Sequence, residues 1–461
     1  MENVPAPTVL LEAFNVALRK GTGIATYTRS LTEAAKANGY HVDGLLHSFS
    51  GLDAQDSLLG EIGFYDLRHL APSKFTLNVE SNWRRGIGVP FGFKARRMRR
   101  SGMIVDSGAA ALSAVGLFRN TYVARMFMDF SRFHFKRYGT AARLRLPQLP
   151  DLFHTTQMIP LKVPRAANIY TIHDIVPLRM PYTTLDDKKF FLSAVRYLCR
   201  KADHIVTVSE SSKADIIALT GISEHRITNT YQAVSIPKSL LADSVEDVAK
   251  TVENLFGLVY QKYYLFYGAI EPKKNISGLI SAYAASGTDC PLVIAGPLGW
   301  QYHDDLAQIE RYVEHKAYKN KRKERILRLD YLPFAHLVTL IRGARALLFP
   351  SLYEGFGLPV LESMSLGTPV MTSTAASLAE IAGDAALLVD PLDVRAMTKA
   401  VQMIDADRDL RADLAQRGPK RAKLFSPEAY RRRIGALYGA VLGSAKLTLD
   451  TEAYASPRYS R

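Results

Sequence analysis

The sequence has few of the features that mark secreted or membrane-spanning proteins. It contains only two cysteines, Cys199 and Cys290, so neither a disulfide framework nor a cysteine zinc site is expected. No apolar run approaches the roughly 20 residues that a membrane-spanning helix needs. The run Val9–Leu11 is too short for the core of a signal peptide, and Glu12 interrupts it. We therefore expect a cytoplasmic protein.

The composition is that of a globular protein. A length of 461 residues predicts two domains, each large enough to bury its own core. The hydrophobic fraction of 48% and the charged fraction of 22% exclude a largely disordered chain. The formal net charge of +15 is strongly basic, and its distribution along the chain is uneven.

Much of the positive charge lies in residues 84–145, where fourteen basic residues face two acidic ones, a net charge of +12. Aromatic and other apolar side chains lie between these charges, a pattern that predicts contact with an anionic membrane surface or an acidic acceptor. Nucleic acid and a solvated basic face are the alternatives. The densest part is the cluster Lys94, Arg96, Arg97, Arg99 and Arg100.

The most informative stretch is Pro350–Glu362, PSLYEGFGLPVLE. It follows the run Ala344–Phe349, which has the composition of a buried parallel strand. Gly355 and Gly357 allow the backbone to bend and to approach a ligand closely. Pro359 suits the first position of a helix, where its missing N–H costs nothing. The stretch therefore predicts a strand, a glycine turn and a helix N-terminus.

Two glutamates accompany this predicted helix N-terminus, whose free N–H groups and dipole favour an anion. We place Glu354 in the turn and Glu362 in the first helical turn, from which it can reach back toward the same site. We expect the positive helix end to keep Glu362 ionised, as an acceptor for a pair of sugar hydroxyls. An anion site with two carboxylates suits a nucleotide-sugar. The alternative is an ordinary βα turn with two surface glutamates.

This stretch resembles the E-x7-E motif of retaining glycosyltransferases with the GT-B fold, specifically family 4. The resemblance continues through Met364–Ser373 and Ser377–Ala386 and covers most of the C-terminal half. It implies an α/β protein with the GT-B architecture, two Rossmann-like domains facing a central cleft. It also implies sugar transfer from a nucleotide-diphosphate donor with retention. No metal or other cofactor is expected, because basic side chains and helix dipoles can neutralise the leaving diphosphate.

The domain boundaries follow from the pattern and the resemblance together. We place an N-terminal, acceptor-side domain at 1–240, with a basic and aromatic insertion at about 84–145 whose elements the pattern does not assign. The nucleotide-sugar domain occupies 262–425, after a segment in which the pattern loosens. A helix at 426–443 returns to the first domain, as the resemblance implies, and 444–461 form a mobile tail.

In the N-terminal half, Gly21 and Gly23 form a glycine loop between a strand and a helix. The resemblance places this loop opposite the donor's phosphates, although a tight turn alone would also explain it. His173 ends a predicted strand, where open α/β sheets bind ligands, and the resemblance puts it near the donor sugar. His154 has weaker support.

In the C-terminal half, the resemblance assigns the donor diphosphate to Lys274, with Lys273 beside it. Ala269 stands where the family usually has an arginine, which puts the number of cations in doubt. Leu332 lies in a segment expected to run past the nucleobase. Ser377 and Glu380 have the spacing of a capping box for another helix.

The resemblance also assigns roles around the motif. Glu354 is expected to hold donor-sugar hydroxyls, helped by the backbone N–H groups of Phe356 and Gly357. Leu358 belongs to the same donor site, and Glu362 is expected to bind the ribose diol. We name no nucleophile. Glu354 and His173 are the two candidate catalytic residues.

The favoured activity is retaining transfer from GDP-mannose to a glycan or a lipid-linked acceptor, in bacterial surface polysaccharide synthesis. The expected place is the inner face of the plasma membrane, through peripheral contact, with no nucleic acid partner. An inactive GT-B relative acting as a binding subunit and a nucleic-acid-binding protein are the rival hypotheses.

Overall fold

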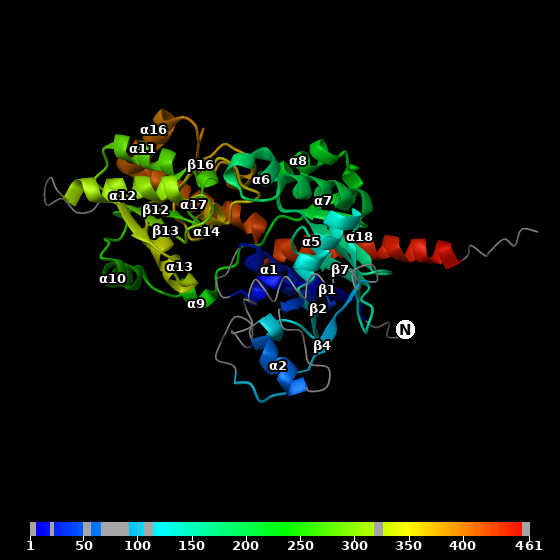
Figure 1. The fold of residues 1–461 in the computed structure, drawn as a ribbon. Helices are drawn as coiled ribbons and strands as arrows, with labels where there is room; N and C mark the ends of the chain where they lie inside the picture. Colours follow the sequence, from blue (N-terminus) through cyan, green and yellow to red (C-terminus); the bar gives the residue numbers. More distant parts are fainter. Residues whose placement is uncertain are drawn as a thin grey trace, which may run out of the picture.

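The structure is a computed structural model, and it describes residues 6–18, 23–48, 57–65, 92–99, 101–105, 114–317 and 326–453. The chain forms two main parallel sheets side by side, each covered by helices (Figure 1). Among the described residues, no helix combines the length and the apolar character needed to cross a bilayer.

The first sheet has eight strands in the order β11-β10-β9-β7-β1-β2-β5-β4, all parallel except that β4 runs antiparallel to β5. Its strands are β1 (Thr8–Glu12), β2 (His41–Ser48), β4 (Arg96–Met98), β5 (Thr121–Arg125), β7 (Leu152–Thr155), β9 (Ala167–Thr171), β10 (His204–Thr207) and β11 (Ile227–Asn229). A small third sheet joins β3 (Phe93–Lys94), β6 (Ala142–Arg145) and β8 (Leu161–Lys162).

Both faces of the first sheet are buried at its centre, since every residue of β7 and four of the five in β1 are buried. Successive side chains of β1 enter different cores, since Val9 and Leu11 belong to one cluster and Leu10 to another. The helices of this half are α1 (Gly23–Ala37), α2 (Ser57–Tyr65), α5 (Phe127–Tyr138), α6 (Val176–Arg179), α7 (Lys188–Lys201) and α8 (Glu210–Thr220), with 3-10 turns η1 (Phe14–Ala17), η3 (Pro181–Thr183) and η4 (Glu224–Arg226).

The second sheet has six parallel strands in the order β14-β13-β12-β15-β16-β17. They are β12 (Tyr264–Tyr267), β13 (Leu292–Ala295), β14 (Ile326–Leu329), β15 (Ala346–Phe349), β16 (Val370–Ser373) and β17 (Leu387–Val389). The helices of this half are α9 (Lys238–Leu241), α10 (Val245–Phe256), α11 (Ile276–Ser286), α12 (His303–Ala317), α13 (Phe334–Gly343), α14 (Leu358–Ser365), α15 (Ser377–Ala382), α16 (Val394–Ala406) and α17 (Arg408–Ala422), with 3-10 turns η5 (Pro272–Lys274) and η6 (Lys423–Phe425).

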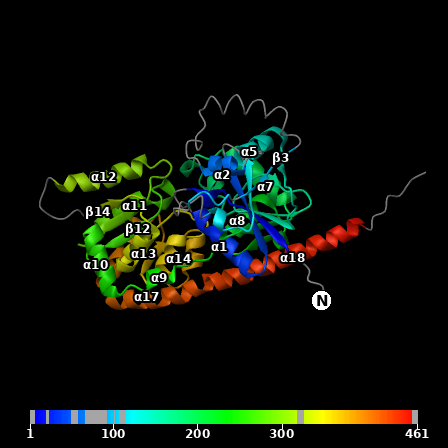
Figure 2. The same cartoon turned by 90° about the horizontal axis from the view of Figure 1, so that it is seen from below.

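The chain returns to the first half at its C-terminal end. Helix α18 (Pro427–Ala453) packs against α1, and Figure 2 shows α17 and α18 running in succession from one half to the other. Tyr430, Ile434 and Tyr438 of α18 are fully buried in the core that contains β1 and α1. The helix continues to Ala453, so the tail predicted from residue 444 is helical as far as that residue.

One expectation about the chain's organisation needs correction. The stretch 84–145 does not stand wholly apart from the regular βα succession, because Thr121–Arg125 is strand β5, paired with β2, and α5 follows it. The segment before residue 262, where the sequence pattern loosens, also has regular structure. It contains α10, whose Val248 and Val252 join the core of the second half. Residues 84–91, Arg100 and 106–113 lie outside the described residues.

Candidate active site

The loop between β15 and α14 has the predicted strand, glycine turn and helix. Gly357 is the N-cap of α14 with φ +112°, a conformation that a side chain would strain, and Pro359 is the second helical residue. Gly355 lies against the other half of the molecule. A Cβ there would come within 2.8 Å of Asp174 Oδ2 and 3.0 Å of the His173 carbonyl oxygen. The loop therefore joins the carboxyl ends of the two sheets.

Glu354 is the centre of a buried charge cluster at this junction. Its carboxylate accepts a hydrogen bond from Lys274 Nζ, and its other oxygen lies 3.8 Å from Lys273 Nζ. Glu271, at 3.5 Å from Lys273 Nζ, completes a set of two cations and two anions. Each of the four side chains is at least four-fifths buried. Sequence reasoning missed Glu271, although it stands next to Pro272 in the same loop.

Burial and charge act in opposite directions in this cluster. Burial alone would raise the pKa of Glu354, but the positive charges of Lys274 and Lys273 outweigh it and lower that pKa. Burial alone would lower the pKa of Lys273, yet Glu354, Glu271 and Asp174 raise it instead. Glu354 and Lys273 are therefore both charged at neutral pH. The cluster supplies a carboxylate and two ammonium groups at the carboxyl edge of a parallel sheet.

Glu362 differs from its expected state in two respects. Helix α14 begins at Leu358, so Glu362 lies in the second turn and not in the first. The residue is partly buried, and the Tyr267 hydroxyl donates to Glu362 Oε2 at 2.8 Å. Burial raises the pKa of Glu362 to about 7, against a smaller opposite effect of this hydrogen bond. The expectation that the helix end keeps Glu362 fully ionised at neutral pH is wrong, since desolvation dominates its pKa.

His173 follows the end of β9, at the carboxyl edge of the first sheet. Its Nε2 lies 2.9 Å from the Thr156 carbonyl oxygen, and its ring packs edge-on against Tyr27 at 4.9 Å. Because a carbonyl oxygen only accepts, Nε2 carries the proton and Nδ1 of the neutral ring is an acceptor. Burial lowers the pKa of His173. The ring is therefore neutral at pH 7 and held in one orientation.

The remaining predicted donor residues lie at different depths around the loop. A Cβ on Gly23 would lie 3.7 Å from Leu358 Cδ1, so the start of α1 faces the start of α14 across the two halves. Gly21 lies outside the described residues. Phe356 is buried in the core of the first half, although it belongs to the loop of the second. Leu332 is partly buried against the core of the second half.

The predicted capping box at Ser377 and Glu380 is wrong. The N-cap of α15 is Ala376, and Ser377 donates its hydroxyl to the carbonyl oxygens of Glu354 and Phe356 instead. Glu380 does not cap its own helix, α15, and its side chain extends to the first half of the molecule. Its two oxygens accept the backbone N–H groups of Glu210 (2.8 Å) and Ser211 (3.1 Å) at the start of α8. Glu380 thus caps a helix of the first half from the second.

Polar contacts between the halves surround the loop. Tyr353 donates its hydroxyl to Asp215 of α8, which also pairs with Arg179 of α6 at 3.3 Å. His154, a weaker candidate for the site, is fully buried between Tyr438 and Thr171 and packs inside the first half. The arrangement brings Glu354, Lys273, Lys274 and His173 to one junction and leaves His154 out of it.

Two Rossmann-like halves meet at their carboxyl edges, where Glu354 of the β15–α14 loop pairs with the lysines of η5. These features define the class of the protein, a GT-B glycosyltransferase. Residues 21–236 match the family described as Glycosyltransferase Family 4, and residues 258–421 match Glycosyl transferases group 1. The chain belongs to family 4 of the GT-B glycosyltransferases, and it is a glycosyltransferase.

Several curated proteins are similar in sequence. The O-antigen chain mannosyltransferase B of Escherichia coli is 36% identical over 278 residues, which cover 59% of this chain and 69% of that protein. The O-antigen chain mannosyltransferase RfbU of Salmonella typhimurium is 27% identical and is covered over 60% of its length, against 51% of this chain. The serotype-specific mannosyltransferase WbdA of Escherichia coli is 29% identical, with 52% of this chain covering only 30% of that protein.

Solved structures share the fold at lower identity. The sucrose-phosphate synthase of Thermosynechococcus elongatus superposes with a TM-score of 0.61 at 18% identity, over 95% of this chain and all of that one. WaaG, a glycosyltransferase involved in lipopolysaccharide biosynthesis, gives a TM-score of 0.57 at 14% identity, over 92% and 99% of the two chains. These likenesses confirm the predicted GT-B fold.

Proposed function

We propose that the protein transfers mannose from GDP-mannose, with retention of configuration, to a glycan or lipid-linked acceptor during synthesis of a bacterial surface polysaccharide. The observation that carries the proposal is the buried cluster in which Glu354, in the loop before α14, pairs with Lys273 and Lys274 of η5. The names of the similar proteins, which include O-antigen mannosyltransferases, support the choice of sugar and product.

The cluster suits the departure of a nucleoside diphosphate. Lys273 and Lys274 supply positive charge, and the N-terminus of α14 supplies free N–H groups, so the charge that develops on the leaving diphosphate is stabilised without a metal. Charged Glu354 accepts hydrogen bonds from sugar hydroxyls, and this contact orients the donor. With these two lysines, the site has cationic support although Ala269 replaces the family's usual arginine.

Glu362 and His173 flank this cluster. Glu362 accepts from the ribose diol when it is ionised, and Tyr267 fixes its position. The neutral imidazole of His173 presents an Nδ1 acceptor, and its hydrogen bond to Thr156 fixes the orientation of the ring. Because this neutral imidazole carries no positive charge, it does not compete with the lysines for the diphosphate. It can still accept a hydrogen bond from a sugar hydroxyl and so position the sugar.

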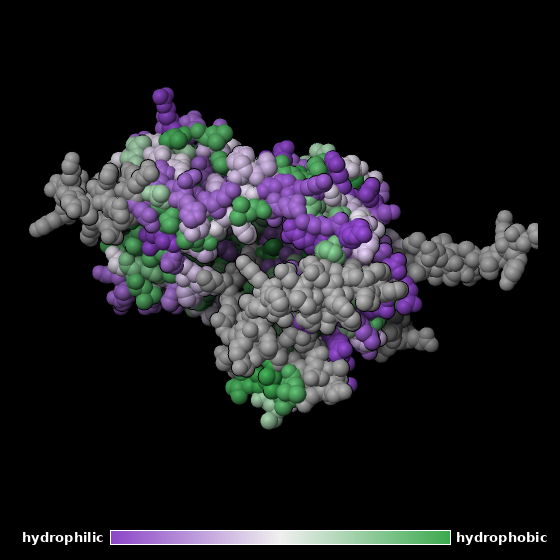
Figure 3. Space-filling model, viewed as in Figure 1, coloured by the Kyte–Doolittle hydropathy of each residue, from purple (hydrophilic) through white to green (hydrophobic). Residues whose placement is uncertain are grey.

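Acceptor access is proposed at an anionic membrane, which the protein touches peripherally. Leu59 and Ile62 of α2 are exposed. Figure 3 shows a hydrophobic patch at the lower end of the molecule, where Figure 1 places α2. Arg96 and Arg97 on the neighbouring strand β4 are exposed as well. Apolar and basic side chains together suit an anionic bilayer surface.

Donor hydrolysis and transfer assays with GDP-, UDP- and dTDP-sugars test the proposal. We expect GDP-mannose to be consumed fastest, with activity retained in EDTA and an α-linked product detected by NMR. Consumption of a different donor would overturn the sugar assignment. Activity that EDTA abolishes and Mg²⁺ or Mn²⁺ restores would overturn the metal-free mechanism. Tight, steeply salt-dependent binding of nucleic acid without donor turnover would support the rival function.

A further inference from the structure

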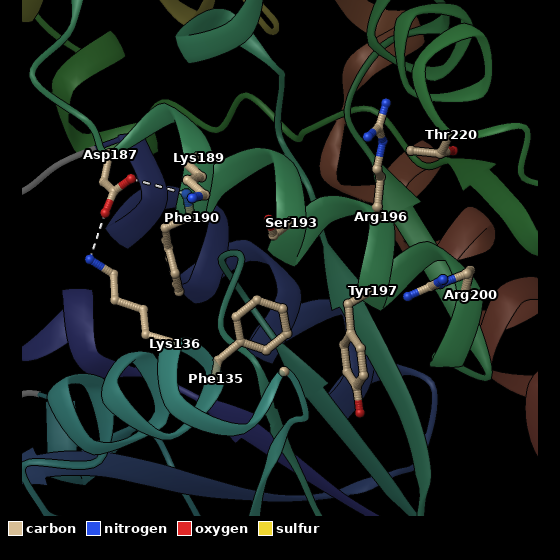
Figure 4. Close-up of a pocket in the computed structure, with 11 residues that line it drawn as sticks. Phe135, Lys136, Asp187, Lys189, Phe190, Ser193, Arg196, Tyr197, Arg200 and Thr220 are labelled. Atoms are coloured by element: carbon tan, nitrogen blue, oxygen red, sulfur yellow. Dashed lines mark hydrogen bonds and ion pairs between the residues drawn. The ribbon is translucent and has the colours of Figure 1, made fainter.

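A second concave surface lies away from the junction of the two sheets, between α5 and α7. It is a hollow of about 760 Å³ in the first half of the molecule (Figure 4). Four cationic side chains line it, Lys136 of α5 and Lys189, Arg196 and Arg200 of α7. Asp187 is the one carboxylate among the residues that the structure places in its lining. We call this hollow the α5–α7 groove.

The spacing along α7 explains how one helix contributes three of the cations. Lys189, Arg196 and Arg200 are separated by seven and four residues, so they lie along one face of the helix. All three are exposed, and within the described residues none has a carboxylate at ion-pair distance. Their positive charge is available to a ligand.

Asp187 does not neutralise the three cations of α7, because both of its carboxylate oxygens already have other partners. Its Oδ1 accepts the Phe190 N–H at 3.0 Å and so caps the N-terminus of α7. Its Oδ2 pairs with Lys136 Nζ at 2.5 Å. This ion pair and the cap lower the pKa of Asp187 to about 2, the hydrogen bond to Lys136 being the main cause.

The base of the groove is aromatic. Phe135 packs edge-on against Phe190 at 5.8 Å and against Tyr197 at 5.3 Å, and the Arg132 guanidinium lies over the Phe190 ring at 4.7 Å. An apolar base with a cationic rim fits a ligand whose charge is attached to an apolar body. A small hydrophilic anion uses only the rim.

The loop before α7 adds an apolar tip beside the groove. The side chains of Tyr182 and Leu185 are 70% and 68% exposed, and they precede Asp187 by a few residues. Exposed large apolar side chains next to unpaired cations are typical of surfaces that touch bilayers. This observation is independent of the charge count in the groove, and it indicates the same partner.

We propose that the α5–α7 groove binds the phosphate headgroup of an anionic membrane lipid, while Tyr182 and Leu185 enter the bilayer. The inference deepens the proposed function and rests on it, since a membrane-held acceptor requires such a contact. A guanidinium group can donate two hydrogen bonds to the oxygens of one phosphate. Each additional cation near an anionic surface strengthens the electrostatic attraction to that surface.

Co-sedimentation with vesicles tests this site. The variant Arg196→Glu/Arg200→Glu removes two rim cations, and Arg395→Glu/Lys399→Glu makes the same change on exposed α16 of the other half as a matched control. Because each basic residue contributes about 1 kcal/mol and 1.4 kcal/mol is tenfold, we expect the groove variant to bind phosphatidylglycerol vesicles about thirtyfold more weakly or worse. The control variant should bind like the wild type.

The other arms separate the headgroup from its competitors. Vesicles of phosphatidylcholine alone should bind poorly, and inorganic phosphate should compete only weakly, because it lacks the apolar body. Leu185→Ser should weaken vesicle binding without reducing competition by phosphate. The proposal is overturned if the groove variant and the control variant bind phosphatidylglycerol vesicles equally well. It is also overturned if the groove binds a single-stranded oligonucleotide as tightly as it binds these vesicles. Donor hydrolysis measured without vesicles should proceed at the same rate in the wild type and in all variants. If the wild type hydrolyses no donor, the proposed function is overturned, but the proposed lipid site is not.

Discussion

The Nδ1 atom of His154 lies 2.8 Å from the hydroxyl of Tyr438, although 284 residues separate the two in the chain. The other ring nitrogen lies 2.9 Å from Thr171 Oγ1, which is 3.0 Å from the Tyr27 hydroxyl. All four side chains are buried, and burial lowers the pKa of His154 to about 3. A series of hydrogen bonds therefore connects α18 to the centre of the first sheet. It ends at Tyr27, whose ring packs on His173.

Replacing the end of this chain should lower stability and leave donor binding unchanged. In Tyr438→Phe, the neutral and fully buried His154 loses a hydrogen-bond partner, so we expect the free energy of unfolding to fall by about 1–3 kcal/mol. Urea denaturation measures this loss. Tyr40→Phe is the matched control, because the Tyr40 ring packs on Tyr438 at 5.4 Å while its hydroxyl has no hydrogen-bond partner among the described residues. Equal losses in the two variants would contradict the role of the hydrogen bond.

Glu362 should make the protein less stable as the pH rises. Its pKa is raised from 4.5 to about 7 in the folded state. Between these values the folded protein keeps a proton that the unfolded chain has released, so stability falls with rising pH, by about 3 kcal/mol in all. Glu362→Gln removes this loss. We expect the variant to match the wild type near pH 4.5 and to be more stable by up to about 3 kcal/mol near pH 8, as measured by urea denaturation across that range. A pH-independent difference would contradict the burial effect.

The same substitution should weaken the nucleotide site. Ribose hydroxyls donate to an ionised carboxylate, so the affinity of the wild type for GDP should rise with pH until Glu362 is fully ionised, above about pH 7. Near pH 8 the variant should bind GDP more weakly by about 1.5–3 kcal/mol, the value of a hydrogen bond to a charged group. Calorimetry over the pH range measures both effects. The variant also corrects for titration of the GDP phosphate, which is common to the two proteins.

Glu354 should affect turnover more than nucleotide affinity, because its proposed contact is with the transferred sugar. We expect Glu354→Gln to lower kcat by about ten- to a hundredfold, as a charge-assisted hydrogen bond is lost. The affinity for free GDP should change little. The amide keeps the shape of the side chain, so gross misfolding is avoided, although Lys274 loses a buried counter-charge. Equal losses of kcat and GDP affinity would place Glu354 on the diphosphate instead.

Sequence reasoning located the loop and its charges but not their surroundings. Gly355, Gly357 and Pro359 act through local backbone geometry, which a short stretch of sequence specifies. The ionisation of Glu362 depends on its burial and on the hydrogen bond from Tyr267, 95 residues earlier in the chain. No local pattern reveals either. Glu380 has the spacing of a capping residue, but its partner is in the other half.

One missed element was visible in the sequence. Helix α10 begins with a capping box, Ser244 with Asp247, and its apolar Val248 and Val252 are four residues apart. These signals indicate a helix in the segment where the pattern was described as loose. The strand β5 was harder to find, because its Tyr122 and Val123 are embedded among basic residues whose charge suggested a surface segment.

Glu380 should control how firmly the two halves are held together. Glu380→Ala removes the acceptor for two N–H groups of α8, a change worth about 1–2 kcal/mol for a capping residue. We expect a larger radius of gyration in solution scattering of the ligand-free variant and a raised KM for the donor. Glu310→Ala on exposed α12 is the control. An unchanged scattering profile would contradict this role, because the loss of the cap would then be local to α8.

The basic cluster predicted from the sequence provides a second, separable test of membrane contact. Arg96 and Arg97 are exposed on β4, while Arg100 lies outside the described residues. Six strand spacings of about 4.8 Å separate β4 from β10, on which α7 packs, so these two strands are about 29 Å apart. Sites this far apart contribute additively. We expect Lys94→Glu/Arg96→Glu/Arg97→Glu/Arg99→Glu to weaken binding to phosphatidylglycerol vesicles at low salt, and less so at high salt, because long-range attraction is screened. Combining it with the groove variant should sum the two losses. Wild-type binding by the cluster variant at low salt would show that the groove alone makes the contact.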